Sequence, residues 1–357
     1  MEGAEIPPDV KSGWGIYILA SQRVNVLLLV AIWLWQWMLK LLSSCQLDVS
    51  TVIQSRKPNE MVLPLSHAQM QRLSRQFAVR LSRIIVPLQL IGLLCQSWAE
   101  ATERSSNLAQ FAILLLPLIQ FVIIVGSISR NCQIINYCIK RILLIETSPR
   151  PMRNVYILLS DTLTSFTKPL IDFTLYLTTL FLSKDVLWTH CDLLISLFPL
   201  NIRIWQCFRE FYLGRDKSLL VNALKYISSI PIMVCVWHSR VDPEKHNSNV
   251  VHWFQCLNSC FTLVWDVRMD WKINSLRRIR KNHKTSQNVI FPKFVYYMGV
   301  LFDFSIKFWW IWTLKRPDHT ILFASELQYL EILRRSVWVI FKLESEYVTI
   351  RNLATEK

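Results

Sequence analysis

Charged residues are scarce in this chain, and the sequence motifs of nucleotide-dependent enzymes are missing from it. Asp, Glu, Lys and Arg make up 18% of the 357 residues, whereas soluble domains carry about 25%. Neither the P-loop nor the GxGxxG motif of nucleotide-binding proteins occurs, and the HExxH motif of zinc metalloproteases is missing as well, so none of these sites is indicated. The nine Cys residues form no metal or disulfide pattern, and we interpret them as buried free thiols. We therefore expect no enzymatic activity, no metal and no cofactor.

Long apolar runs take the place of the missing charges. Hydrophobic residues make up 52% of the chain, the mean hydropathy is +0.29, and 15 residues are Trp. Runs near the length of about 20 residues that crosses a hydrocarbon core recur along the whole sequence. The start, MEGAEIPPDV, lacks the basic n-region of a signal peptide, so the first apolar helix is expected to be an uncleaved anchor. The sequence thus predicts an all-α, polytopic membrane bundle.

Nine apolar stretches are candidate membrane spans, and segment 131–146 could form a tenth helix along the interface. The nine spans cover residues 24–42, 78–98, 108–128, 155–182, 187–208, 219–238, 250–267, 294–314 and 321–343. The intervening segments form two alternating sets, one with 22 Lys and Arg residues and the other with eight. Because basic loops face the cytosol, this count predicts a lumenal N-terminus and a cytosolic C-terminus.

The net charge of +15 follows the same loop pattern and does not indicate nucleic acid. The most basic loop, 268–293, holds eight Lys and Arg residues. We interpret it as a topology determinant that touches anionic lipid, and a specific ligand site is the alternative.

Several cations fall inside the predicted spans. Arg334 and Arg335 are adjacent within 321–343, and a cation at the membrane centre costs about 2.5–3.5 kcal/mol. The other cations in apolar segments are Lys168, Arg203, Lys225 and Lys307. Three- or four-residue spacing places side chains on one helix face. It relates Glu331 to Arg334, Asp303 to Lys307, Asp266 to Asp270, Asp161 to Thr164, and Thr164 to Lys168.

Two interpretations of these charges are open. They could be internal ion pairs that hold the bundle together, although apolar packing would do this better because desolvation offsets the attraction within a buried pair. They could instead line a pathway for an anion, since forked Arg donors match a tetrahedral oxyanion such as phosphate. We favour the pathway for the set as a whole. Lys168 fits both interpretations, and Arg203 could equally snorkel toward the end of its span.

Four stretches of the chain combine charged and aromatic residues in a distinctive order: NIRIWQCFREF (201–211), LVNALKYIS (220–228), SCFTLVWDVRMDW (259–271) and LEILRRSVWVIFKLESEY (330–347). They resemble the EXS domain, the membrane domain of eukaryotic phosphate exporters of the xenotropic and polytropic retrovirus receptor type. The order WDxxMDW, RRxxW and LExE is the specific feature, and the resemblance covers about residues 128–350. It implies that the domain conducts inorganic phosphate.

By this resemblance, ten positions are expected to contact phosphate. They are Asp161, Thr164, Lys225, Tyr226, Asp266, Lys307, Trp310, Glu331, Arg334 and Arg335. Lys307 stands where the exporters usually have Arg, which changes a bidentate contact into a point charge. Thr164 stands where they usually have Asn.

The resemblance also implies a cellular role. Only about 23 residues precede the first span, so the soluble regulatory SPX domain of the exporters is expected to be missing, as in the short fungal Erd (ER retention defective) type. That type implies a Golgi membrane protein, a homodimer in contact with membrane lipids. It would return lumenal phosphate to the cytosol and support glycosylation and the retention of lumenal ER proteins and glycosyltransferases.

On this basis we divide the chain into five parts. They are a lumenal N-terminus (1–23), N-terminal transmembrane helices (24–128), a cytosolic or interfacial connector (129–154), the EXS transport core (155–345) and a cytosolic tail (346–357).

Two other functions remain open. The chain could be a sorting partner that binds glycosyltransferases through loop 268–293 and the C-terminal tail, without transport. It could also be a membrane transferase acting on a phosphorylated lipid, with Asp266 and Asp270 as metal ligands, although His is sparse in the spans.

Overall fold

The computed structural model is built of α-helices. It describes residues 20–53, 65–102, 107–144, 153–181, 191–242, 248–273, 290–315 and 320–355, and it contains no strand within those ranges. The predicted all-α class is confirmed. The N-terminal residues 1–19 and most of the basic loop 268–293 lie outside the described residues.

Four described segments are long and apolar enough to cross a membrane. They are α1 (Ala20–Ser44), residues His67–Trp98 of α3 (His67–Thr102), residues Ile113–Asn131 of α4 (Asn107–Asn131), and Lys217–Val241, which contains α9 (Lys217–Ile227) and α10 (Ile230–Val241). These segments confirm a multi-pass membrane protein. The count of nine spans and the orientation of the termini stay predictions.

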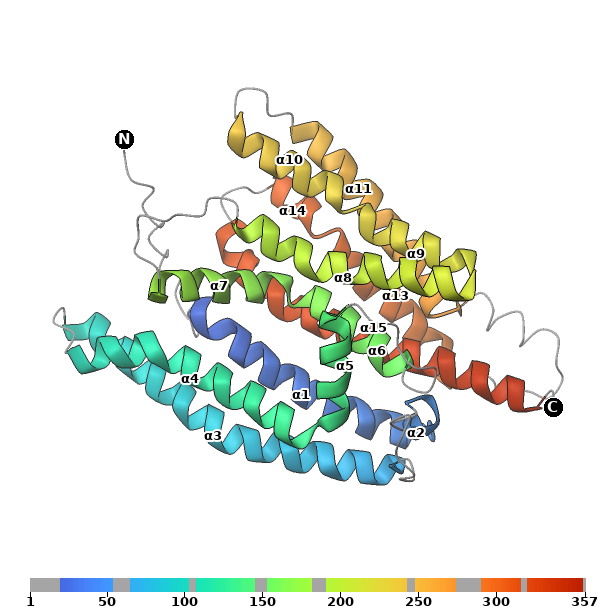
Figure 1. The fold of residues 1–357 in the computed structure, drawn as a ribbon, viewed down its shortest axis with the longest axis horizontal. Helices are drawn as coiled ribbons and strands as arrows, with labels where there is room; N and C mark the ends of the chain where they lie inside the picture. Colours follow the sequence, from blue (N-terminus) through green and yellow to red (C-terminus); the bar gives the residue numbers. More distant parts are fainter. Residues whose placement is uncertain are drawn as a thin grey trace.

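The helices form a layered bundle with α15 (Thr320–Thr355) at its centre (Figure 1). On one side α1 packs against α3 and α4, and it also contacts α7 (Thr167–Phe181) and α15. On the other side α8 (Cys191–Gly214) packs against α9, and α10 packs against α11 (Ser248–Trp265). The short helices α2 (Val49–Val52) and α5 (Gln133–Leu143) complete the N-terminal half. Helix α5 confirms a separate helix within segment 131–146, over Gln133–Leu143, and its place at the interface stays a prediction.

Helices α13 (Lys293–Lys307) and α15 pack tightly against each other, and this contact sets the positions of Lys307 on α13 and Arg334 on α15. Trp338 and Leu343 of α15 are buried in the largest apolar core, together with Leu39 of α1. Gly299 of α13 lies directly against α15, because a Cβ at this position would be 2.3 Å from the Phe341 ring. A glycine is therefore needed for the two helices to approach this closely.

Four helices of the core are interrupted near the middle of the bundle. Phe166 separates α6 (Arg153–Ser165) from α7, Ser228 and Ser229 separate α9 from α10, Phe308 and Trp309 separate α13 from α14 (Trp310–Lys315), and α11 continues into a π-helix, η3 (Asp266–Asp270). The sequence analysis assigns 155–182, 219–238 and 294–314 as single spans and does not foresee these local breaks. Lys217–Val241 is long and apolar enough to be one span despite its break, and the other two assignments stay predictions.

Proline explains two of these interruptions. A Pro removes one helical hydrogen bond, and its ring clashes with the carbonyl of the residue four positions earlier. Pro169 and Pro231 stand four positions after Ser165 and Ile227, which are the last residues of α6 and α9. The local sequence therefore determines where these two helices are interrupted.

Candidate anion-binding site

The predicted phosphate-contacting residues lie beside the four helix interruptions. Those before or at an interruption are Asp161 and Thr164 on α6, Lys225 and Tyr226 on α9, Asp266 at the start of η3, and Lys307 at the end of α13. Glu331, Arg334 and Arg335 face them from the unbroken α15. Irregular backbone is tolerated at membrane depth only where protein buries it or where it lines a polar cavity.

Arg334 is the centre of a buried ion-pair cluster. Its side chain is 7% exposed, and its guanidinium lies 2.6 Å from Glu331 Oε1, 2.8 Å from Asp303 Oδ1 and 3.7 Å from Asp266 Oδ2. The structure confirms Glu331 as a local partner. Asp303 shares the i,i+4 spacing with Lys307 but was not among the ten expected positions.

Lys307 is held by two of the same acids. Its Nζ lies 2.5 Å from Asp266 Oδ2 and 2.9 Å from Asp303 Oδ2. Arg334 and Lys307 together therefore face three carboxylates. In this conformation both cations are saturated by acids.

Arg203 forms a second buried cluster. Its Nε lies 2.7 Å from Asp161 Oδ1, and the Tyr226 hydroxyl donates to the same oxygen at 2.6 Å. Arg203 Nη1 also donates to Ser160 and Gln206, both at 2.9 Å. Because the residue is 4% exposed and fully paired, the snorkelling interpretation is wrong.

Two further cations differ from these, because the described residues place no carboxylate oxygen within 4.0 Å of either. Lys225 is buried, and its Nζ lies over the rings of Tyr226 (4.6 Å) and Trp265 (5.4 Å). Arg335 donates from Nε to Ser165 Oγ at 2.8 Å and from Nη2 to Thr164 Oγ1 at 3.2 Å. The contacts described for these two side chains are with rings and hydroxyl groups, which hold a cation more weakly than a carboxylate in direct contact does.

Lys225 and Arg335 converge on the same region. Lys225 Nζ lies over the ring of Tyr226, whose hydroxyl donates to the Asp161 carboxylate at 2.6 Å. Arg335 donates to Thr164 Oγ1, which in turn donates to the Asp161 carbonyl. An anion placed between α6, α9, η3 and α15 would therefore meet two cations, the Thr164 hydroxyl and the acids that tune their field. This is the candidate anion site.

Trp310 lies slightly apart from this site. Its Nε1 donates to Ser259 Oγ at 3.2 Å, its ring stacks on His252 at 5.8 Å, and Ser259 in turn donates to the Lys307 carbonyl. These contacts place Trp310 against α11, and Ser259 links Trp310 to the backbone of Lys307.

A cavity of about 190 Å³ adjoins the site on one side. Its lining is Ser165, Lys168, Pro169, Ile306, Leu327, Gln328 and Glu331. Ser165 donates to Glu331 at 2.8 Å and accepts a hydrogen bond from Arg335. The cavity wall therefore contains a residue that is hydrogen-bonded to Arg335 of the candidate site.

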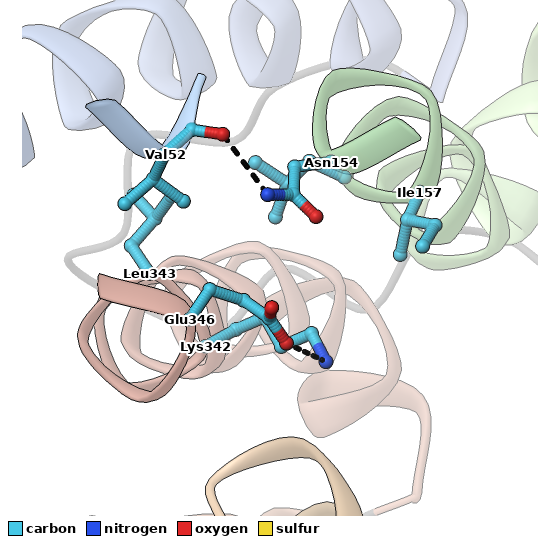
Figure 2. A pocket seen from close by; sticks show the side chains of 7 residues that line it. Val52, Asn154, Ile157, Lys342, Leu343 and Glu346 are labelled. Carbon is cyan, nitrogen blue, oxygen red and sulfur yellow. Dashed lines mark hydrogen bonds and ion pairs between the residues drawn. The ribbon is translucent and has the colours of Figure 1, made fainter. Parts of the chain in front are cut away.

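A much smaller cavity lies at the other end of the contact between α6 and α15 (Figure 2). A small cavity of about 10 Å³ lies between Val52, Asn154, Lys342 and Glu346, which is room for about one water. Asn154 donates to the Val52 carbonyl at 2.9 Å, and Lys342 pairs with Glu346 at 3.2 Å. Asn154 and Ser165 are eleven residues apart on α6, so the two cavities are separated by about 16 Å.

Asp266 and Asp270 serve two different ion pairs. Asp266 contacts Lys307, whereas Asp270 Oδ1 lies 3.2 Å from Lys342 Nζ. The π-helix between them closes i→i+5 hydrogen bonds, such as Trp271 N to Asp266 O at 2.8 Å. The α-helical spacing expected for this pair is therefore wrong, and the lipid transferase with two Asp metal ligands gains no support.

Comparison with known proteins fits this architecture. The EXS family model matches residues 18–348, so the similarity extends well before residue 128. The chain is 41% identical to Protein ERD1 of Saccharomyces cerevisiae, covering 91% of this chain and 92% of that protein. It is 32% identical to Protein ERD1 of Kluyveromyces lactis, covering 93% and 95%.

A more distant similarity links the core to solute carriers. Solute carrier family 53 member 1 of Mus musculus is 28% identical over 168 residues, which is 43% of this chain and 24% of that protein. The family match and the ERD1 relatives cover nearly the whole described bundle, including the interrupted helices and α15. The chain therefore belongs to the EXS family.

Proposed function

We propose that this protein is a Golgi membrane transporter or channel that returns inorganic phosphate from the lumen to the cytosol. The observation that carries the proposal is the pair Lys225 and Arg335, two cations in the core without a described carboxylate partner. Intramembrane cations without acid partners suit a pathway for an anion. The relative named as a solute carrier supports the same class of activity.

The charge balance of the site favours a transported ligand over a tightly held one. The core brings together five cations (Arg203, Lys225, Lys307, Arg334 and Arg335) and four acids (Asp161, Asp266, Asp303 and Glu331). One positive charge is left over, which monovalent phosphate would neutralise. The nearby acids limit the affinity, and a transport site must release its ion as well as bind it.

Arg335 and Lys225 take different parts in this mechanism. The planar guanidinium of Arg335 can offer two parallel N–H donors to phosphate oxygens, and Lys225 adds a point charge. Thr164 Oγ1 already accepts from Arg335 and donates to the Asp161 carbonyl at 2.7 Å. An arriving phosphate would replace the Thr164 and Ser165 hydroxyls as acceptors, so no acid has to be displaced first.

Transport into proteoliposomes tests this proposal. Purified wild type should take up radiolabelled phosphate, and Arg335→Ala should lose most of that uptake. Lys40→Gln, which changes an exposed lysine at the far end of α1, should behave as wild type. Equal uptake by wild type, Arg335→Ala and empty liposomes would contradict the proposal.

The Golgi location and the support of glycosylation and protein retention are part of the same proposal. They rest on the 41% identical ERD1 relative and on the multi-pass helical bundle. A homodimer through α1 is also proposed, because Trp37 is 56% exposed on this helix. Crosslinking in native membranes, combined with localisation of the tagged full chain, would test both.

The rival function is a retention partner that binds glycosyltransferases without transport. The eight basic residues of loop 268–293 favour it, although most of that loop lies outside the described residues. Reversing the loop charges separates the two functions. Lost retention with intact phosphate transport would support the partner role, and retention that fails only in transport-dead variants would count against it.

A further inference from the structure

A buried amide in the wall of the 190 Å³ cavity has no partner for its oxygen. Gln328 of α15 lines this cavity and is 5% exposed. Its Nε2 donates to Asp172 Oδ2 at 3.0 Å, whereas its Oε1 accepts no hydrogen bond from the residues that the structure describes. A buried acceptor without a donor costs free energy, so this oxygen calls for a partner.

The contact with Asp172 determines which way the amide faces. Asp172 Oδ1 pairs with Lys168 at 2.8 Å, and an ionised carboxylate can only accept hydrogen bonds. The NH₂ group of Gln328 therefore has to face Asp172, and it cannot exchange places with Oε1. Gln328 is thus held as an acceptor for a donor that the described residues do not supply.

The neighbouring acceptor on α15 is already occupied. Glu331 lies three residues after Gln328 and lines the same cavity. Its Oε1 accepts from Ser165 at 2.8 Å and from Arg334 Nη2 at 2.6 Å, and its Oε2 accepts from Arg334 Nε at 2.7 Å. Of these two acceptors in the cavity wall, Gln328 is the one with an unpaired oxygen.

The cavity is large enough for an oxyanion and adjoins a cation of the candidate anion site. One water molecule needs about 10–15 Å³ of such space, so a cavity of 190 Å³ has room for several. Ser165 in the cavity wall accepts from Arg335 Nε at 2.8 Å. An anion that reaches Arg335 through this cavity therefore passes Gln328.

An unpaired acceptor beside an anion pathway favours anions that carry a proton. Monovalent and divalent phosphate both keep a P–OH group, which can donate to a carbonyl oxygen. Sulfate carries no proton near neutral pH and can only accept. A sulfate oxygen against Gln328 Oε1 would leave both acceptors unpaired, and such mismatches discriminate strongly between ligands of similar shape.

We propose that Gln328 selects phosphate over sulfate by accepting a hydrogen bond from the P–OH group of the anion in the cavity. The hydrogen bond to Asp172 holds the amide in the accepting orientation. This inference rests on the proposed transport function and assigns a specificity role to a residue outside the ten expected positions.

Competition in proteoliposomes tests this assignment. Uptake of radiolabelled phosphate by purified wild type is measured with unlabelled phosphate, arsenate or sulfate as competitor. Arsenate keeps an As–OH group and should inhibit at concentrations similar to phosphate, whereas sulfate should require at least about tenfold more. In Gln328→Met, which has a similar volume and no amide oxygen, the sulfate-to-phosphate ratio of inhibitory concentrations should fall about three- to tenfold, as expected for the loss of one hydrogen bond.

Two further variants control for structural effects of the substitution. Gln120→Met removes a buried amide of α4 that also has an unpaired atom but does not line the cavity. Asp172→Asn keeps an acceptor for Gln328 Nε2 and removes only the carboxylate charge. Both variants should keep the wild-type ratio, even where they lower the unfolding temperature. A similar fall of the ratio in Gln120→Met would overturn the specificity role of Gln328.

A purely structural role for Gln328, with a water bound to Oε1, gives a different result. Gln328→Met would then lower the unfolding temperature or the maximal rate and leave the ratio unchanged, which would overturn the specificity role alone. If Gln328→Met does not fold, Gln328→Asn withdraws the amide by one methylene and should lower the ratio in the same direction.

The wild type and Arg335→Ala separate this inference from the proposed function. Equal inhibition by arsenate and sulfate in wild type would overturn the specificity role, while uptake that requires Arg335 would still support transport. Uptake that does not require Arg335 would overturn both.

Discussion

Lys307 Nζ lies 2.5 Å from Asp266 Oδ2, which ties the last residue of α13 to the first residue of the π-helix η3. The ammonium group also reaches Asp303 Oδ2, so a single point charge connects the acids of two helices. Resemblance to the phosphate exporters leads to the expectation of an Arg at this position. The compact ammonium group of Lys307 fits between the two close carboxylates, where the planar guanidinium group of an Arg would need more room.

Removal of the Lys307 charge should destabilise the protein. In Lys307→Met, Asp266 and Asp303 lose one of the two cations that they share and keep only Arg334. Removing one partner from a buried ion pair typically costs about 3–5 kcal/mol. Thermal unfolding in detergent should show a clear drop for Lys307→Met and a smaller one for Lys307→Arg. Identical curves for the three proteins would show that the pair is not buried as described.

Lys225→Met should have the opposite effect on stability. Lys225 is buried against two aromatic rings with no described carboxylate partner, so its desolvation is only partly offset. We expect the phosphate-free protein to gain about 1–3 kcal/mol, the usual penalty for an unsatisfied buried group, while phosphate uptake falls at least tenfold. Arg203→Met, which breaks the ion pair with Asp161, is the matched control and should lose stability. A loss in both variants would contradict the distinction between paired and unpaired cations.

Gly299→Ala should disturb the approach of α13 to α15. The added Cβ would lie 2.3 Å from the Phe341 ring, and overpacking of this kind costs about 1–3 kcal/mol. Gly126→Ala is the matched control, because no atom lies within 4 Å of a Cβ at that helical position. We expect a lower unfolding temperature for Gly299→Ala and an equal or higher one for Gly126→Ala. The contrary ranking would show that the two helices can separate freely.

Pro169→Ala should allow α6 and α7 to join into one helix. The substitution restores the backbone donor to the Ser165 carbonyl and removes the ring that clashes with it. Thr164 and Lys168 would then rotate relative to each other, so we expect phosphate uptake to fall by about tenfold or more with stability retained. Uptake kinetics and thermal unfolding on the same preparation check this. Normal uptake would show that the interruption is not required.

Local information in the sequence accounts for much of this architecture. Hydropathy predicts a helical membrane protein, because the bilayer requires apolar helices of a minimum length. The i,i+3 spacing of Glu331 and Arg334 predicts a pair that the structure confirms at 2.6 Å. Pro169 and Pro231 also encode two helix interruptions, a signal that the span assignment did not use.

Long-range contacts decided which cations are paired. Arg334 and Arg335 are adjacent in sequence, but successive residues of a helix point about 100° apart. One therefore meets Asp303 and Asp266 from other helices, while the other meets the hydroxyls of Ser165 and Thr164. Hydropathy and helical spacing identify two adjacent arginines whose burial in the membrane costs free energy, and Glu331 as an acid on the same helix face. The packing of α6, α13 and η3 around α15 determines that Arg334 is surrounded by carboxylates and that Arg335 contacts hydroxyl groups instead.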